Sequence, residues 1–407
     1  MGQQNDSRTV PLIREHRPSE RIFPSVPINS RKSYRETRAS SDNLDALLLF
    51  ADLNWGRTMK RILKWLLSLL ALAILLAGAF FIHVWYFKPA SINWFYGRVF
   101  AQFAAQSPEL LSNMRILPPW LDFYSDKLDD ASPAHEAEVA AMVKSDVDTL
   151  HRYDRAKLDA NGALSYDVLD YFLSIQVEGD AFRDHDFPVN QLSGIQSSLP
   201  NFMAQTHQVN DRHDADAYIA RLDRFPQKFS QVLDGLKLRE SKGVIPPQFT
   251  VEEVIAQMDG FIGKPAKENM LYTSFKEKLD KIPADKLDTS SRNALLAGVE
   301  GSIDRSVYPA YRQLIDYFKT LQPKAQGNFG AWHLPDGDAY YAWCVRMHTT
   351  TDMTPEQVHN LGRAEVARIS SEMDAILKDK GLADGTIGAR VQQLAHAPDA
   401  TFPNTPD

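Results

Sequence analysis

A stretch of 23 residues without a charged side chain constrains this sequence more than any other feature. It runs from Trp65 to Phe87, WLLSLLALAILLAGAFFIHVWYF, and contains no Asp, Glu, Lys or Arg. At about 1.5 Å per residue, a helix of this length spans roughly 35 Å, enough to cross a bilayer. Few helices of soluble proteins are apolar on every side over such a length. We therefore predict one transmembrane helix over residues 62–87, with the lipid bilayer as the partner of residues 65–87.

Basic residues in front of the apolar stretch indicate its orientation. Only Lys88 directly follows the stretch, whereas four basic residues lie just before it: Arg57, Lys60, Arg61 and Lys64. The positive-inside rule then keeps the N-terminal side in the cytoplasm. A cleaved signal peptide is the alternative, because Ala77-Gly78-Ala79 has the small-x-small pattern of a cleavage site. We expect a single-pass protein of the inner (cytoplasmic) membrane, with its N-terminus inside and its main domain periplasmic or extracellular.

The segment before the apolar stretch, residues 1–58, is rich in Arg, Ser and Pro and shows little helical periodicity. Met59 begins MKRILKW, which is how a signal or anchor segment usually starts. We therefore expect residues 1–58 to be either a disordered cytoplasmic tail or mis-assigned upstream sequence.

The remainder, residues 92–407, has the pattern of consecutive helices. Strong helix formers dominate and β-branched runs are scarce. Ser107-Pro108, Ser132-Pro133 and Thr354-Pro355 are typical N-terminal caps, and Gln357 completes a capping box. No period of 20–50 residues repeats, which argues against a solenoid. We predict an all-α, irregular multi-helix domain, with helices at 92–106, 132–154, 164–176, 214–241, 336–347 and from 355 onward, and a loop at 187–201. Pro226 should kink the helix at 214–241. Residues 284–321 form either one helix or two, broken near Gly301 or Pro309.

Two of these predicted helices carry apolar residues at helical spacing, which places them on one face of each helix. In the helix at 164–176 they are Leu164, Val168, Leu169, Phe172 and Ile175. In the helix from 355 onward we expect them to form a buried stripe: Val358, Leu361, Ile369, Met373, Ile376 and Leu377.

The charge of the predicted external part excludes one class of partner. From residue 65 onward there are 33 Lys and Arg against 45 Asp and Glu. An acidic domain without a basic stripe is a poor binder of nucleic acid, so we expect none as a partner. The single cysteine, Cys344, lies among apolar neighbours and cannot form an internal disulfide.

Metal-binding patterns are present only in fragments. His135-Glu136 begins like the zincin motif H-E-x-x-H, but Val139 stands where the second histidine would be. Glu356-x-x-His359 matches one half of a di-iron motif, and no second copy follows the apolar stretch. We predict no metal ligands and no catalytic residues in this chain. The neighbouring His207, Asp211 and His213 fit a solvated loop better than a site.

The strongest candidate site is the segment around YYAWCVRMHTTTD, Tyr340 to Asp352. Arg346 could clamp a carboxylate such as the C-terminus of a peptide-like substrate. Tyr341 and His348 could hydrogen-bond a developing oxyanion, and Tyr340 completes the set of substrate-cleft candidates. The alternative is that Tyr340 belongs to the core and that Arg346 pairs with an acid at a helix end.

This segment resembles a known family. The run GAWHLPDGDAYYAWCVRMHTTTDMTPEQVHNLGRAEVARI, residues 330–369, is similar to the bacterial domain-of-unknown-function 885 family, and the resemblance extends from about residue 100 to the end. It implies an exported or lipid-anchored α-helical protein similar to gluzincin-type zinc metallopeptidases. It also implies that Tyr341, Arg346 and His348 line the cleft near the metal.

The resemblance stops before the family's zinc-binding segment, H-E-x-x-x-G-H-like, which lies further toward the C-terminus. No residue here matches that segment, so we expect zinc only in a full-length relative and a domain 92–407 that is truncated at its C-terminus. Two hypotheses follow. The chain is the inactive, substrate-side half of a zinc metallopeptidase-like protein, or it is a membrane-anchored helical binding or scaffold module with no catalytic role.

Overall fold

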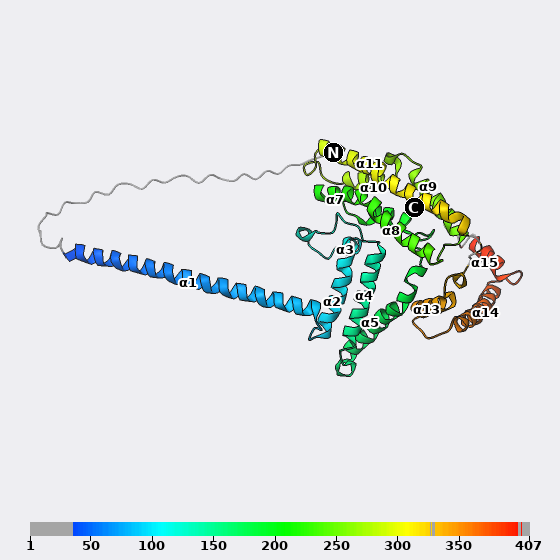
Figure 1. Cartoon of the computed structure of the whole chain (residues 1–407), viewed down its shortest axis with the longest axis horizontal. Coiled ribbons are helices and arrows are strands. Elements are labelled where there is room, and N and C mark those ends of the chain that lie inside the picture. The colour runs from blue at the N-terminus through cyan, green and yellow to red at the C-terminus, as the bar shows by residue number, and fades with distance from the viewer. Residues whose placement is uncertain (1–35, 326, 328–329, 398–399, 401–407) are drawn as a thin grey trace, which may run out of the picture. The chain divides into compact units, whose positions relative to one another are not determined.

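The computed structural model describes residues 36–325, 327, 330–397 and 400, and of residues 36–57 only the helix. The described part is all-α, as predicted, and contains no strand (Figure 1). Its α-helices are α1 Glu36–Tyr86, α2 Ile92–Gln106, α3 Pro108–Met114, α4 Pro133–Leu150, α5 Ala160–Gly179, α6 Ile195–Asn201, α7 Arg212–Asp223, α8 Phe225–Ser241, α9 Gln248–Ile262, α10 Met270–Leu279, α11 Thr289–Ser302, α12 Tyr308–Leu321, α13 Gly337–Thr349, α14 Pro355–Asp379 and α15 Ile387–Ala395.

Short 3₁₀ and π turns join several of these helices. The 3₁₀ turns are Pro119–Leu121, Arg155–Lys157, Asp180–His185, Ala266–Glu268, Gln322–Lys324 and Ala331–His333, and the π turns are Phe202–Thr206 and Ile303–Val307.

Most predicted helix positions are confirmed within a few residues, and the exceptions follow from local chemistry. The kink predicted at Pro226 is confirmed: the helix at 214–241 is divided at Arg224, because proline cannot continue the hydrogen-bond ladder. The predicted loop at 187–201 is wrong in its second half, because α6 forms there. Helix α15 was not predicted, although Thr386 caps it by accepting a hydrogen bond from the backbone N–H of Ala389.

Helix α1 contains the apolar stretch. Its part Thr58–Tyr86 is long and apolar enough to cross a membrane, and none of its most apolar portion is buried. This fits a membrane anchor or a signal helix. The helix continues upstream to Glu36 without a break at residue 58, and residues 1–35 of the predicted tail lie outside the described residues. The chain divides into two compact units after Phe81, so the last turn of α1 belongs with the helical domain.

The centre of the domain is one large apolar cluster built by α7 to α12. Helix α12 lies against α8 and α9 and buries its whole apolar face. Phe229 of α8 meets Tyr311 of α12 with ring centroids 5.0 Å apart. Burial on this scale is the main term that stabilises a helical domain. Fully buried members include Tyr218, Leu222, Phe225, Phe229, Val251, Val254, Met258, Leu271, Phe275, Leu279, Val299, Ile303, Val307, Tyr311, Leu314 and Phe318.

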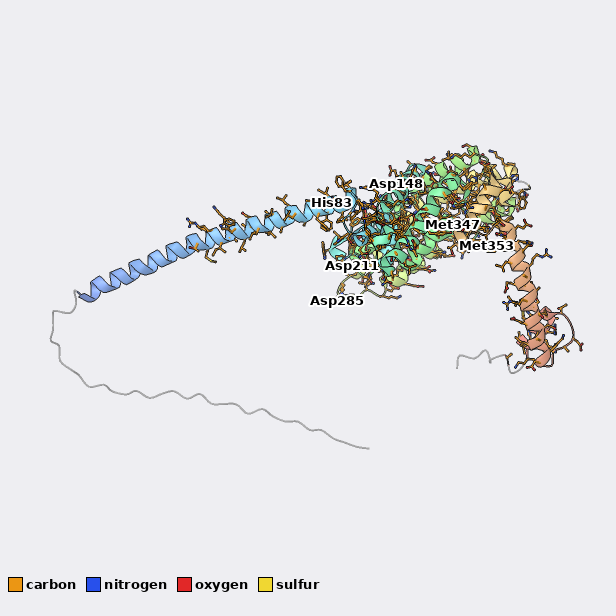
Figure 2. The ribbon with its side chains drawn as sticks, turned by 90° about the horizontal axis from the view of Figure 1, so that it is seen from below. His83, Asp148, Asp211, Asp285, Met347 and Met353 are labelled. Carbon is orange, nitrogen blue, oxygen red and sulfur yellow. The ribbon has the colours of Figure 1, made fainter. Side chains whose placement is uncertain are left out.

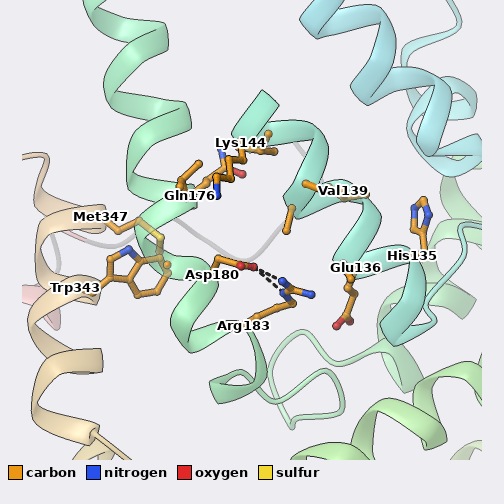
Figure 3. A pocket seen from close by; sticks show the side chains of 15 residues that line it. His135, Glu136, Val139, Lys144, Gln176, Asp180, Arg183, Trp343 and Met347 are labelled. Carbon is orange, nitrogen blue, oxygen red and sulfur yellow. Dashed lines mark hydrogen bonds and ion pairs between the residues drawn. The ribbon is translucent and has the colours of Figure 1, made fainter. Parts of the chain in front are cut away.

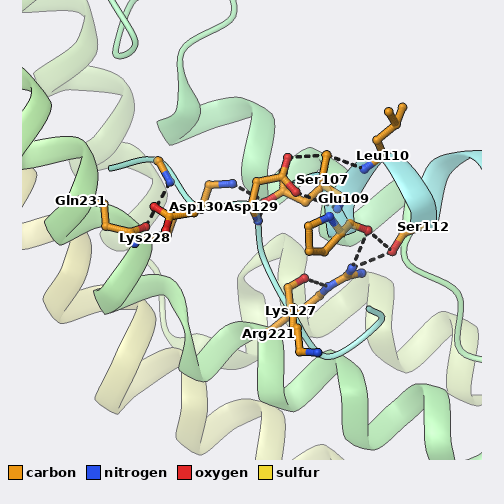
Figure 4. Close-up of polar contacts among 12 residues, drawn as sticks. Ser107, Glu109, Leu110, Ser112, Lys127, Asp129, Asp130, Arg221, Lys228 and Gln231 are labelled. Carbon is orange, nitrogen blue, oxygen red and sulfur yellow. Dashed lines mark hydrogen bonds and ion pairs between the residues drawn. The ribbon is translucent and has the colours of Figure 1, made fainter. Parts of the chain in front are cut away.

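A fully buried arginine ties α7 to the segment that leads into α4 (Figure 4). Arg221 donates to Ser112 Oγ at 2.6 Å, to the carbonyl of Lys127 at 2.8 Å and to His207 Nδ1 at 2.8 Å. Burial lowers the pKa of Arg221 to about 10, opposed by nearby carboxylates including Glu109, so the side chain stays charged at neutral pH. His207, expected in a solvated loop, is therefore a buried structural residue, and that expectation is wrong.

Helices α13, α14 and α15 lie outside this cluster. In α14 the only buried residue is Leu377, and Leu361, Ile369 and Ile376 of the predicted core-facing stripe are exposed. In Figure 2 the side chains of α14 and α15 point into open space on most sides. The prediction of a buried stripe on α14 is wrong for these three residues, because within the described residues no helix covers that face.

Candidate functional site

A groove of about 570 Å³ lies between α4, the C-terminal end of α5 and α13 (Figure 3). Its α4 wall is built largely from short side chains, which leave the space open. The lining residues are His135, Glu136, Ala137, Val139, Ala140, Ala141, Val143, Lys144, Gln176, Val177, Gly179, Asp180, Arg183, Trp343 and Met347.

A close approach at Gly179 positions the α13 wall. A Cβ atom on Gly179 would lie 2.2 Å from Cζ2 of Trp343, so only glycine fits there. The indole Nε1–H of Trp343 donates to the carbonyl of Ile175 at 2.9 Å. Met347, one helical turn further along α13, then faces the same groove (Figure 3).

Charged groups gather at one end of the groove. Arg183 Nε donates to Asp180 at 2.8 Å. Glu136 lies 3.7 Å from the guanidinium of Arg239, which binds Asp186 more closely at 2.6 Å. Burial raises the pKa of Glu136 in spite of the opposing charge of Arg239, and its Oε2 has no hydrogen-bond partner. The carboxyl of Glu136 is therefore the least well satisfied acid along the groove.

The four predicted cleft residues lie on α13, but none of them lines this groove. Tyr340 packs in an aromatic cluster, with ring centroids 5.0 Å from His185 and 5.7 Å from Phe182. Burial raises the pKa of Tyr340, and a hydrogen bond with Cys344 adds to the effect. Tyr341 and His348 are exposed.

Arg346 forms an ion pair with Glu178 in the last turn of α5, and its carbonyl accepts a hydrogen bond from the Tyr171 hydroxyl at 2.7 Å. This is the pairing with a helix-end acid that the sequence left open. The role of Tyr340, Tyr341, Arg346 and His348 in a substrate cleft stays a prediction. Sequence reasoning missed Trp343 and Met347, although their i, i+4 spacing places them on one helix face.

No metal centre is formed by the described residues. No group of three or more His, Cys, Asp or Glu side chains lies together in them. His135 has Glu138 as its acidic neighbour, with 3.9 Å between ring nitrogen and carboxylate, and Glu356 and His359 are exposed on α14.

The fold and the groove define an all-helical domain that has a ligand-sized groove and follows an apolar N-terminal helix in the sequence. The sequence matches the model of the DUF885 family, bacterial proteins of unknown function, over residues 116–407. The chain belongs to this family. No curated protein matches the sequence.

Two solved structures share the fold. One is from Colwellia psychrerythraea and is provisionally described as a lipoprotein. It is 22% identical, with a TM-score of 0.69, and the match covers 76% of this chain and 56% of that one. The other is from Shewanella oneidensis and is provisionally described as a lipoprotein of unknown function. It is 15% identical, with a TM-score of 0.52, and the match covers 75% of this chain and 52% of that one. The chain thus spans about half the length of these two proteins.

Proposed function

We propose that this chain is a membrane-anchored, extracytoplasmic protein that binds a peptide-like ligand in the groove of α4, α5 and α13 without cleaving it. In this proposal it corresponds to the substrate-side half of a zinc metallopeptidase-like protein, and zinc is held only in full-length relatives. One observation carries the proposal. The segment that resembles the family signature supplies a wall of the groove through Trp343 and Met347.

The chemistry of the groove supports a peptide-like ligand. A volume of about 570 Å³ is in the range of small-molecule and short-peptide sites. Alanine and valine side chains of α4 form an apolar wall, and Lys144, Asp180 and Arg183 add charges of both signs. Such a lining can hold apolar side chains while charged groups bind the peptide termini.

The charge pattern around the apolar helix supports the anchoring part of the proposal. Four basic residues precede the apolar stretch and Lys88 alone directly follows it, which favours a cytoplasmic N-terminus. The domain from α2 onward would then lie on the opposite side, periplasmic or extracellular.

Peptide titration of the full chain in lipid nanodiscs tests the binding. We expect saturable heat with the free pentapeptide Ala-Leu-Ala-Leu-Ala and weaker binding of Ala-Asp-Ala-Asp-Ala. Ala140→Trp fills the groove and should weaken binding about tenfold or more, equivalent to about 1.4 kcal/mol. The matched control is Ala294→Trp on the exposed face of α11, outside the groove, which should leave binding unchanged. If neither peptide binds, the scaffold alternative is favoured instead.

A zinc measurement tests the catalytic part. We expect the purified full chain to hold less than one equivalent of tightly bound zinc. Added zinc should not produce hydrolysis of the two pentapeptides. Cleavage that a chelator abolishes would contradict the binding-only function.

A further inference from the structure

A second groove, of about 600 Å³, lies between α2, α4 and α5 on the helical domain. Its lining is almost entirely apolar, and its one ionisable carboxylate, Asp146, is buried and paired with Arg98 at 2.9 Å. The groove of α4, α5 and α13, which we call the peptide groove, is not lined by any residue of α2. The two grooves nevertheless share two lining residues, Val143 and Gln176. They therefore lie next to each other on α4 and α5.

Large apolar side chains stand exposed around this second groove. They form what we call the α2–α5 apolar face, and their exposed fractions run from 46% to 63%: Phe100, Phe103, Leu164, Val168 and Phe172. The three α5 members belong to the apolar face that their helical spacing predicts. A contiguous exposed apolar patch of this kind marks an interaction surface.

Contacts of Arg98 place this face beside the end of the apolar helix. Arg98, at the middle of α2, donates to the carbonyl of Phe87 at 3.0 Å and to that of Val84 at 3.5 Å. Phe100 and Phe103 follow two and five residues later on the same helix, a rise of only about 3 and 7.5 Å along its axis. Both rings therefore lie within a few helical turns of the point where the apolar helix ends.

The composition of α2 favours lipid over water as its surroundings. Arg98 is its only charged residue, and that side chain is buried and paired. The exposed side chains at the end of α1 and directly after it are aromatic, as is common at membrane interfaces: Trp85, Tyr86 and Phe87. A surface that is apolar, aromatic and free of charge on α2 suits the boundary between headgroups and acyl chains.

We propose that the α2–α5 apolar face is a membrane-docking surface that inserts Phe100, Phe103 and Phe172 into the phospholipid leaflet at the C-terminal end of α1. The occupant is the bilayer itself. This inference rests on the proposed membrane anchoring. Because Val143 and Gln176 line both grooves, the peptide groove then opens beside the bilayer surface, and ligands reach it along the membrane.

Depth-dependent quenching of a fluorescent label in the full chain tests the docking. The native cysteine is removed by Cys344→Ala, and single cysteines are introduced by Phe103→Cys, Phe172→Cys, Leu72→Cys and Glu277→Cys. Each is labelled with an environment-sensitive dye and reconstituted as one copy per nanodisc of phosphatidylethanolamine and phosphatidylglycerol. Part of the lipid carries a nitroxide near the top of its acyl chain. Leu72 reports insertion of the apolar helix, and Glu277, exposed on α10, is the matched control.

We expect the nitroxide to quench the fluorescence of the labels at positions 72, 103 and 172 by about twofold or more, and not to quench the label at position 277. If the label at position 72 is quenched but the labels at positions 103 and 172 are not, the docking of the α2–α5 apolar face is overturned, while anchoring by the apolar helix still holds. Blue-shifted emission at 103 without quenching means that protein covers the face, which also overturns the lipid assignment. No quenching at 72 overturns the anchoring and the docking together.

Discussion

Helices α12 and α14 each carry an apolar stripe, but their surroundings are opposite. In α12 all seven residues that face inward are buried, among them Tyr311, Leu314 and Phe318. In α14, although the helix is longer, Leu377 alone is buried. The difference teaches that an amphipathic pattern fixes which side of a helix is apolar, whereas the neighbouring helices decide whether that side leaves water.

Helix α14 is held by local interactions in place of packing. Thr354 and Gln357 form a reciprocal capping box, with hydrogen bonds of 3.2 and 2.8 Å. Arg368 pairs with Glu365 and Glu372, each at 2.7 Å, one helical turn away on either side. Capping and such pairs together stabilise a helix by only about 1–2 kcal/mol. We therefore expect α12 and α14 to respond differently to substitution, because α12 depends on packing and α14 on local interactions.

The largest effect is expected from Leu314→Ala on α12. Leu314 is completely buried, so the substitution removes packing and leaves a cavity. We expect a loss of about 2–5 kcal/mol in the free energy of unfolding. Urea denaturation of the full chain in detergent, followed by near-ultraviolet circular dichroism, measures it. A loss of less than about 1 kcal/mol in the free energy of unfolding would show that the apolar face of α12 is not buried by its neighbouring helices.

We expect the free energy of unfolding to fall in acid because of His207, which is buried in the domain. Burial, with the charge of Arg221 next, lowers the pKa of His207 to about 3 from its ordinary 6.5, while its Nε2 lies 3.0 Å from the carbonyl of Asp214. The unfolded state then binds more protons between these values. The free energy of unfolding falls by up to about 1.4 kcal/mol per pH unit as pH drops from about 6.5 towards 3. His207→Gln should flatten this slope, and His359→Gln on exposed α14 should not.

A smaller and local effect is expected from Thr354→Ala. The substitution removes the capping box of α14 and should destabilise that helix by about 1 kcal/mol. Amide hydrogen exchange over residues 355–379 should therefore become about fivefold faster, with exchange in α12 unchanged. Thr354→Ser keeps the capping oxygen and is the control. Equal acceleration in both helices would mean that α14 is packed on the core.

The smallest effect is expected from Leu361→Ala, the counterpart of Leu314→Ala on α14. Leu361 is half exposed, so its truncation should change the free energy of unfolding by no more than about 0.5 kcal/mol. The same urea denaturation measures it. A loss of 2 kcal/mol or more would show that another protein surface covers α14 in solution and would remove the contrast between the two helices.

The candidate site was partly readable from the sequence. The signature segment directed attention to α13, and that helix does form a groove wall. The choice of Tyr340, Tyr341, Arg346 and His348 followed side-chain chemistry alone, whereas Trp343 and Met347 line the groove because Gly179 lets α13 approach α5. That approach joins residues more than 160 positions apart, and spacing in the sequence carries no information about it.

By itself, the sequence determined the elements that depend on neighbours along the chain. The apolar helix, the bounds of α2 and the capped starts of α3, α4 and α14 all follow from residues within a few positions of one another. Only the tertiary structure decided which apolar stripes are covered, why His207 is buried, and which face of α13 meets a groove. Those outcomes depend on packing between distant helices, and helical periodicity is the same whether an apolar face meets protein, lipid or water.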